Sequence, residues 1–178
     1  MHSSTTYRCH VITLSDRASR GEYNDESGTR IVHCLEAQAA KERIAFKTER
    51  TLIPDDANQL AATIHRLTNQ EPVDVIFTTG GTGIGPRDIT PDTLAPMFDK
   101  TLPGIMELIR VKYALENPRA ALSRGVAGTI KQTLVFTLPG SKKAVDEYCQ
   151  IIMPLLIHAL EMLHGDNTNH PPHNPIEL

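Results

Sequence analysis

Short runs of strand-forming residues alternate with helical patterns along almost the whole chain of 178 residues. Apolar runs rich in strand-forming residues occupy residues 8–14, 44–53, 73–79 and 133–138. Amphipathic spacing predicts helices between these runs and a last helix after Ser141, which Pro154 should kink or divide. The alternation predicts an α/β fold, a three-layer α/β/α domain with a mostly parallel sheet.

Capping residues predict where several helices begin. Ser27 is the predicted cap of the first long helix, and Asp56 with Gln59 three residues later fits a capping box. Thr90 is the predicted cap of a short helix that has Pro91 at its first position. Each of these helices would follow a predicted strand, as the alternation requires.

Length and charge limit the class of protein. The chain is long enough for one domain, which we expect over residues 8–165, between a flexible N-terminus (1–7) and a His/Pro-rich tail (166–178). A net charge of −3 provides no broad basic surface, so we expect no nucleic-acid partner. No apolar run forms a signal region or a membrane span, so we expect a soluble, cytoplasmic protein without a membrane partner.

Cysteine and histidine do not occur at zinc-ligand spacing. The cysteines are Cys9, Cys34 and Cys149, and the tail histidines are His164, His170 and His173. The cysteines are odd in number and lie in apolar stretches, so we expect reduced core thiols. Prolines separate the histidines, and we expect no metal site among them.

Four glycines follow the predicted strand at residues 73–79. They are Gly80, Gly81, Gly83 and Gly85. Glycine lets backbone N–H groups approach an anion closely, so the loop either cradles phosphate or is an ordinary tight turn. The loop fits neither the Walker motif nor GxGxxG.

Arg87 and Asp88 come directly after the glycines and just before the predicted helix start at Thr90. Asp88 could hold Mg²⁺ while Arg87 and backbone amides bind phosphate oxygens. Alternatively, the two side chains form a surface ion pair. The acid favours the reading of the glycine loop as a phosphate site.

Other polar residues stand at the ends of predicted strands. Asp55 is either a metal or substrate ligand or a helix cap, and Ser15-Asp16 either caps a turn or faces a ligand. Pro139-Gly140-Ser141 precedes the last helix and could seat an anion. Since ligands of open α/β folds bind beyond the carboxyl ends of the strands, these residues and the glycine loop would share one site.

The chain resembles the molybdopterin adenylyltransferase family, that of the MogA and MoaB proteins and the G domains of plant Cnx and gephyrin, over about residues 8–165. The motifs that carry the resemblance are Leu14-Ser15-Asp16, Leu52-Ile53-Pro54-Asp55, Thr78-Thr79-Gly80-Gly81-Thr82-Gly83, Pro86-Arg87-Asp88-Ile89-Thr90-Pro91-Asp92, Leu122-Ser123-Arg124 and Leu138-Pro139-Gly140-Ser141. The resemblance implies a molybdopterin-binding fold, usually a homotrimer. It also implies transfer of AMP from ATP to the terminal phosphate of molybdopterin, with Mg²⁺ as cofactor, release of pyrophosphate and hand-over of the product to a molybdenum insertase.

Residue roles follow from the resemblance position by position. Asp55 and Asp88 match the two acids that family members need for activity, and we expect them to position Mg²⁺ and the nucleotide phosphates, with Asp88 as metal ligand. The expected nucleotide and pterin contacts are Ser15, Asp16, Gly80, Gly81, Thr82, Gly83, Arg87, Ser123, Pro139, Gly140 and Ser141. The chain departs from the family at Thr137, where relatives often have Asn, and at Tyr113, where many have Ser.

Two other functions are compatible with such a chain. Some family members hold molybdopterin or act as a scaffold without adenylylating it, but retention of both Asp55 and Asp88 argues against that function here. The CinA-type proteins, which hydrolyse nucleotides or act as deamidases, share the fold. Their glycine loop usually reads GGLGPT, which fits Gly81-Thr82-Gly83 and Arg87-Asp88 less well.

Overall fold

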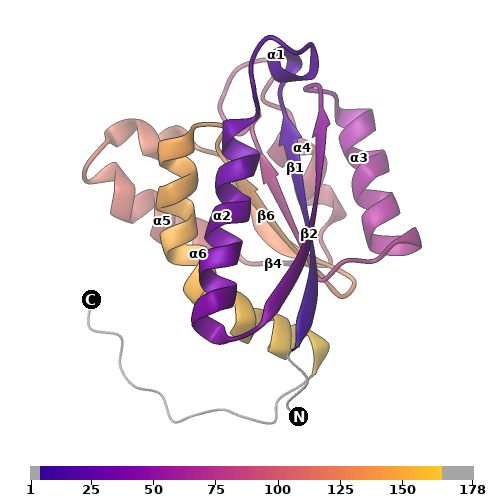
Figure 1. Cartoon of the computed structure of the whole chain (residues 1–178). Coiled ribbons are helices and arrows are strands. Elements are labelled where there is room, and N and C mark those ends of the chain that lie inside the picture. Colours follow the sequence, from indigo (N-terminus) through magenta and orange to yellow (C-terminus); the bar gives the residue numbers. More distant parts are fainter. Residues whose placement is uncertain (1–4, 166–178) are drawn as a thin grey trace.

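The computed structural model describes residues 5–165, which form a sheet with helices packed on both faces (Figure 1). Residues 1–4 and 166–178 lie outside the described part, and the predictions for the C-terminal tail and for most of the N-terminal segment fall there. No helix within residues 5–165 is long and apolar enough to cross a membrane.

Six strands form one sheet in the order β2, β1, β3, β6, β5, β4. The strands are β1 (Thr6–Leu14), β2 (Ala45–Ile53), β3 (Val75–Thr79), β4 (Lys100–Thr101), β5 (Ala127–Ile130) and β6 (Thr133–Leu138). Strands β2, β1, β3 and β6 run parallel, whereas β5 is antiparallel to β6 and β4 is antiparallel to β5. The predicted mostly parallel sheet is therefore confirmed.

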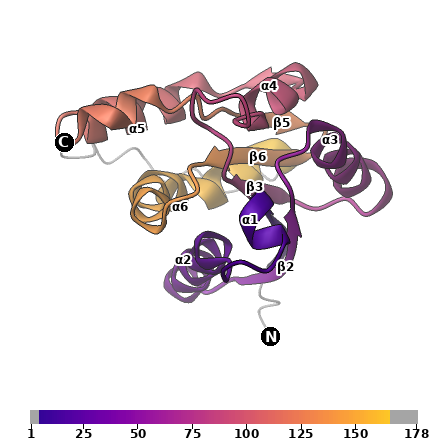
Figure 2. The same ribbon diagram turned by 90° about the horizontal axis from the view of Figure 1, so that it is seen from above.

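Helices cover both faces of this sheet. They are α1 (Asp16–Ser19), α2 (Glu26–Glu42), α3 (Ala57–His65), α4 (Thr90–Leu94), α5 (Pro103–Ala114) and α6 (Lys142–His164), with a π-helical turn at Arg66–Gln70 and 3-10 turns at Ala95–Met97 and Pro118–Leu122. Helices α2 and α6 lie side by side on one face, and α3 lies on the other (Figures 1 and 2). The α/β/α layering is the one predicted from the alternation.

Alternate residues of the parallel strands supply the two halves of the core. Val11 and Phe77 pack with α2, α5 and α6 on one face, while Ile12 and Ile76 pack with α3 and α4 on the other. All four side chains are fully buried. Burial on both faces explains why these strands read as continuous apolar runs rather than as an alternating pattern.

The sequence did not predict β4 and β5. Strand β4 has only two residues, and β5 contains Gly128, a residue type that is depleted in strands. A Cβ on Gly128 would overlap the Phe98 ring, so the glycine is required by packing from outside the strand. A contact with a distant residue such as Phe98 cannot be recognised from the sequence around Gly128.

The predicted division of the last helix at Pro154 is wrong. Helix α6 runs unbroken from Lys142 to His164, with Pro154 on its exposed side. Ile152 and Leu156 flank the proline and are completely buried against the sheet. Tertiary packing of the apolar face therefore outweighs the hydrogen bond that proline cannot donate.

Two predicted helix caps are also wrong. Asp25, rather than Ser27, caps α2 by accepting a hydrogen bond from the Gly28 N–H, and Ser27 lies in the first turn. Thr90 is the first residue of α4 rather than its cap, and its hydroxyl donates to the Gly80 carbonyl at 2.8 Å. The predicted Asp56 cap of α3 is confirmed, since its carboxylate accepts from the Gln59 N–H.

The prediction of three core thiols holds for two of them. Cys9 in β1 and Cys149 in α6 are buried, whereas Cys34 in α2 is only partly buried. All three are free thiols in the structure.

Candidate active site

The candidate site lies where four parallel strands end at the same edge of the sheet. Ladder pairs align Leu14 with Ile53 and Thr79 with Leu138, so the loops after β1, β2, β3 and β6 leave the sheet at one level. Helix α1 stands at this end of the molecule (Figure 1). The chain order also reverses here, because β2 and β3 lie on opposite sides of β1. Such a switch point is where open α/β sheets bind ligands.

Hydrogen bonds hold the start of the glycine loop in place. The Gly80 N–H donates to the Leu138 carbonyl at 3.0 Å, and the Thr79 hydroxyl donates to the Pro139 carbonyl at 2.9 Å. Gly80 has φ +104°, and a Cβ at this position would overlap the Leu14 carbonyl oxygen. The loop after β3 is thus packed directly against the loops after β1 and β6, which only glycine permits at residue 80.

A cavity of about 410 Å³ opens beside the glycine loop. Nine of the predicted site residues line it, namely Gly80, Gly81, Thr82, Gly83, Asp88, Ser123, Pro139, Gly140 and Ser141. The structure therefore brings together residues from three loops that are distant in sequence. The remaining predicted residues, Ser15, Asp16, Asp55 and Arg87, do not line this cavity.

Asp16, Asp55 and Arg87 form a cluster next to the cavity. The Asp16 N–H donates to the Asp55 carboxylate at 3.0 Å, and the Asp55 N–H donates to the Asp16 carboxylate at 3.1 Å. Arg87 donates to both oxygens of Asp16. A Cβ on Gly81 would lie 3.6 Å from Asp55 Oδ1, which places this carboxylate against the glycine loop.

The two carboxyl groups of this cluster have opposite pKa shifts. Hydrogen bonds from the Arg87 guanidinium and the Asp55 N–H lower the pKa of Asp16. Burial raises the pKa of Asp55, and the charges of Asp16 and Asp88 act in the same direction, while the hydrogen bond from the Asp16 N–H and the charge of Arg87 oppose them. Asp55 therefore faces negative charge that Arg87 offsets only in part, a setting that a bound cation would relieve.

Asp88 folds back over the glycine loop. Its Oδ2 accepts from the Gly85 N–H at 2.8 Å, and a Cβ on Gly83 would lie 2.7 Å from the same oxygen. Asp88 makes no ion pair with Arg87, whose guanidinium binds Asp16 instead. The surface-pair alternative for Arg87 and Asp88 is therefore wrong.

The structure also separates capping residues from candidate ligands. Ser15 caps α1 by accepting from the Ala18 N–H, and its hydroxyl lies 2.8 Å from the Tyr23 hydroxyl. Ser141 caps α6. Asp55 caps no helix, since Asp56 does so for α3, and its carboxylate accepts from the Asp16 N–H at the site.

Several cavity residues were not predicted from the sequence. They are Ile109, Asn117, Arg119, Ala120, Leu122, Ala144, Glu147 and Tyr148. The Tyr148 hydroxyl lies 2.7 Å from Ser123 Oγ and is therefore part of the same wall. Burial raises the pKa of Tyr148, while its hydrogen bond to Ser123 acts against this, so the phenol is neutral. Ala144 and Tyr148 follow the Ser141 cap at helical spacing, and this spacing could have indicated that they share one face of the helix.

Arg124 connects the far side of the glycine loop to α4. Its guanidinium donates to the Gly83 carbonyl at 2.7 Å, to the Asp88 carbonyl at 2.6 Å and to both carboxylate oxygens of Asp92. Its own N–H donates to the Thr82 carbonyl. Arg124 therefore fixes the segment between Thr82 and Asp88 without lining the cavity.

The two departures from the family differ in their position. Tyr113 lines the cavity, and its hydroxyl donates to Gln150 Oε1 at 2.8 Å. Thr137 is completely buried, and its hydroxyl bonds the backbone of Val126 as acceptor and donor. Of the two, only Tyr113 contributes to the wall of the cavity.

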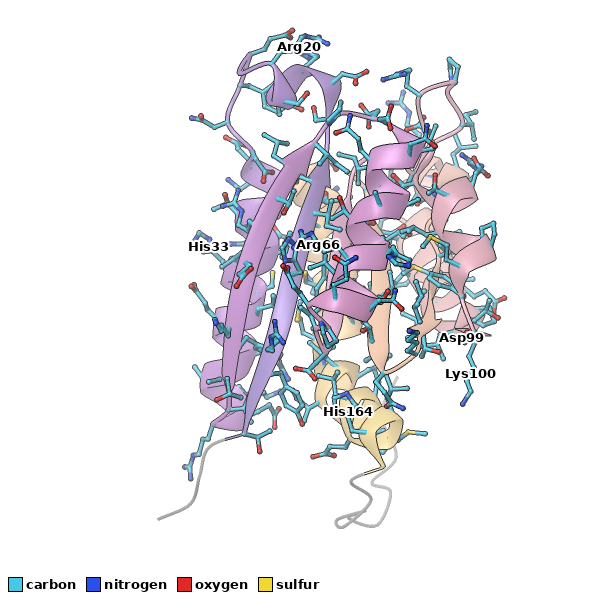
Figure 3. All side chains as sticks on the ribbon, turned by 90° about the vertical axis from the view of Figure 1, so that its right-hand side faces the viewer. Arg20, His33, Arg66, Asp99, Lys100 and His164 are labelled. Carbon is cyan, nitrogen blue, oxygen red and sulfur yellow. The ribbon has the colours of Figure 1, made fainter. Side chains whose placement is uncertain are left out.

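His164 lies at the opposite end of the sheet from the loop that carries Arg20 (Figure 3). Its ring contacts the Gln132 carbonyl and Asp74. Within residues 5–165 there is no group of three or more His, Cys, Asp or Glu side chains that could hold a metal ion. His170 and His173 fall outside the described residues.

Comparison with known families and proteins gives consistent matches. Residues 10–158 match the family described as "Probable molybdopterin binding domain". The chain is 38% identical over 161 residues to the molybdenum cofactor biosynthesis bifunctional protein of Chlorobaculum tepidum, covering 89% of this chain but only 49% of that protein. The chain thus spans about half the length of this relative.

A shorter relative and a solved structure match over nearly their whole length. The molybdopterin adenylyltransferase of Helicobacter pylori is 32% identical over 161 residues, which cover 90% of each chain. The crystal structure of the molybdopterin biosynthesis enzyme MoaB from a Thermus species superposes with a TM-score of 0.80 at 35% identity, covering 89% of this chain and 97% of that chain.

Proposed function

The chain belongs to the family of probable molybdopterin binding domains, and on this basis we propose that it is a molybdopterin adenylyltransferase of molybdenum cofactor biosynthesis. The proposed reaction transfers AMP from ATP to the terminal phosphate of molybdopterin and releases pyrophosphate. The H. pylori relative bears the name of this activity and has nearly the same length. An insertase of molybdenum is the proposed acceptor of the adenylylated pterin.

One observation carries the proposal. Two carboxylates, Asp55 and Asp88, flank a glycine loop that opens onto a cavity at the carboxyl ends of the parallel strands. The cavity is lined by Gly80, Gly81 and Gly83 and by the aromatic side chains of Tyr113 and Tyr148. Such a combination suits a ligand with a phosphate at one end and a flat ring system at the other.

The proposed chemistry requires little proton transfer. An oxygen of the molybdopterin phosphate attacks the α-phosphorus of ATP, a new P–O bond forms, and the bond to the β-phosphate breaks with release of pyrophosphate. The glycine-loop amides and the N-terminus of α6 at Ser141 would orient the phosphates through N–H groups. Positioning and electrostatics then supply most of the rate, and no nucleophilic side chain is needed.

The donor set fits Mg²⁺ as it is bound with nucleotides. Mg²⁺ prefers hard oxygen ligands and is usually held by one or two carboxylates together with phosphates and water. Asp88 would be the metal ligand, and the partly buried Asp55 would position the ion and the nucleotide. When bound, the ion supplies positive charge that stabilises the equatorial oxygens and the leaving pyrophosphate.

Arg87 has a more restricted role than the sequence implied. Its side chain is 64% exposed and bidentate to Asp16. We propose that Arg87 shares its guanidinium between Asp16 and a nucleotide phosphate, with Asp16 holding it at the edge of the site.

An assay of pyrophosphate release distinguishes the candidate functions. The purified protein should release pyrophosphate only when ATP, Mg²⁺ and molybdopterin are all present. A scaffold protein would bind molybdopterin without releasing pyrophosphate. A nucleotide hydrolase of the CinA type would consume ATP at the same rate when molybdopterin is omitted.

Arg124→Met is expected to lower kcat about tenfold to a hundredfold, because it leaves the Gly83 and Asp88 carbonyls without their donor and loosens the carboxylate of Asp88. Met keeps most of the apolar stem. Arg66→Met, which removes an exposed ion pair with Glu71 away from the site, is the matched control and should retain the wild-type rate. Steady-state pyrophosphate release gives kcat for both variants. Equal kcat for Arg124→Met and the wild type would mean that Arg124 does not hold the glycine loop in its active conformation.

We propose further that the protein is a homotrimer, as the resemblance implies. Helix α5 and the following turn expose an apolar surface made of Leu108, Val111, Leu115 and Leu122, with Leu115 85% exposed. Leu108 and Val111 lie in α5 and Leu115 is its C-cap, so these three follow one another at helical spacing. Exposed apolar surfaces of this kind on soluble proteins mark interfaces, and this one adjoins the cavity, which Leu122 also lines.

The wild type should sediment at micromolar concentration with about three times the 19.7 kDa mass of the chain. Leu115→Glu should shift the distribution to the monomer, because it places a charge within the apolar surface. Met162→Glu changes an exposed apolar residue near the end of α6 and should leave the trimer intact. A monomeric wild type in sedimentation velocity would contradict the proposed assembly.

A further inference from the structure

Helices α2 and α6 pack against one another. They run side by side on the same side of the sheet (Figures 1 and 2). Arg30 of α2 forms an ion pair with Asp146 of α6. One turn further along each helix stand Cys34 of α2 and Cys149 of α6, which line the same cavity. The ion pair therefore holds the two helices together one turn away from the two cysteines.

The two thiols differ in their access to solvent. Both line an open cavity of about 460 Å³ whose other lining residues come from α2 and α6. Cys34 is partly exposed, whereas Cys149 is only 4% exposed. A small reagent that enters this cavity would therefore meet Cys34 first.

The surroundings also make the two thiols chemically unequal. The neighbouring Cys149 thiol and the charge of Arg30 lower the pKa of Cys34, while its partial burial and Asp146 act against this. The neighbouring Cys34 and burial raise the pKa of Cys149. Cys34 is thus the thiol that ionises more readily, and the thiolate is the nucleophilic form of cysteine.

We propose that Cys34 and Cys149 are an oxidation site at which a peroxide forms an intramolecular disulfide between α2 and α6. The Cys34 thiolate attacks one oxygen of the peroxide, the O–O bond breaks, and uptake of one proton yields a sulfenic acid and water. The Cys149 sulfur then displaces hydroxide from Cys34, and its proton completes a second water. Two electrons pass from the two sulfurs to the peroxide.

The site is independent of the proposed nucleotide chemistry, but it is connected to the cavity through α6. Tyr148 and Ala144 of the same helix line the cavity beside the glycine loop. A covalent link at Cys149 would therefore restrain a helix that forms part of that wall. Because the bond closes the chain between residues 34 and 149, the oxidised protein should melt roughly 10 °C above the reduced protein.

Peptide mapping of the full-length protein tests the proposal directly. The reduced protein is treated with stoichiometric hydrogen peroxide, blocked with iodoacetamide and digested without reductant. We expect the intact protein to be lighter by about 2 Da before blocking, and the digest to contain a linked peptide pair with Cys34 and Cys149 that dithiothreitol separates. Cys9→Ser is the matched control, because it removes a cysteine outside the pair and should leave the linked peptides unchanged.

Cys149→Ala keeps Cys34 but removes its partner, and should convert Cys34 to the sulfinic acid with a gain of about 32 Da. In the wild type, a stable sulfinic acid at Cys34 beside a reduced Cys149 would overturn the proposal. Disulfides found only between chains would overturn it as well. A competing reference thiol can be added to the same reaction. Cys34 that stays reduced while this thiol is oxidised would also overturn the proposal.

Discussion

Replacing Asp88 by Asn is expected to lower the rate of pyrophosphate release by at least about a hundredfold while molybdopterin still binds. Asn can still accept the hydrogen bond that the Gly85 N–H donates to Asp88. The loop should therefore keep its shape and lose only the charge. Loss of the rate with unchanged pterin affinity would assign the carboxylate to the position of Mg²⁺ and the nucleotide phosphates rather than to folding.

Asp56→Asn is the matched control for the loss of one negative charge near the site. The Asn side chain should still cap α3, because Asn is as good an N-cap as Asp. Single-turnover pyrophosphate release and titration with molybdopterin should be measured for both variants. Wild-type release by Asp88→Asn would exclude Asp88 as the metal-positioning residue.

Gly80→Ala is expected to reduce the free energy of unfolding by about 3 kcal/mol or more. The added Cβ would overlap the Leu14 carbonyl oxygen, and the positive φ of +104° is one that alanine adopts only with strain. Relief of the overlap requires the ends of β1 and β3 to move apart. Because the glycine loop lies directly on these ends, activity should fall together with stability.

Gly104→Ala is the matched control, because a Cβ there meets nothing within 4 Å and the residue lies in the first turn of α5. Alanine forms helix better than glycine, so this variant should be neutral or slightly more stable. Urea unfolding at one fixed protein concentration compares the two variants with the wild type. Equal stability of Gly80→Ala and the wild type would mean that residue 80 is not held as the structure describes.

Local sequence was sufficient to place the parallel strands and the loops that follow them. The apolar run ending at Thr79 and the Pro54-Asp55 pair after β2 gave the positions of the glycine loop and of Asp55. Since parallel strands end at the same edge of a sheet, this was enough to predict that these loops are neighbours. The family resemblance then supplied the pterin and the AMP transfer, which no local pattern contains.

Contacts between distant segments could not be predicted in the same way. Arg87 pairs with Asp16, which lies 71 positions earlier, although its nearest acid in sequence is Asp88. Arg124 reaches Gly83 across 41 positions. Tyr148 follows the Ser141 cap at helical spacing, but which face of α6 borders the cavity is set by packing on the sheet. These partners depend on tertiary packing, and sequence spacing does not record it.

Mass spectrometry of the pterin product tests directly whether the protein transfers AMP to molybdopterin. The purified protein is incubated with molybdopterin, ATP and Mg²⁺, and the pterin fraction is examined for a species that carries one added AMP. The complete reaction should contain adenylylated molybdopterin. None should form when Mg²⁺ is omitted or when Asp88→Asn replaces the wild type. Tight pterin binding by the wild type without any adenylylated product would contradict the proposed function and favour a protein that only holds the pterin.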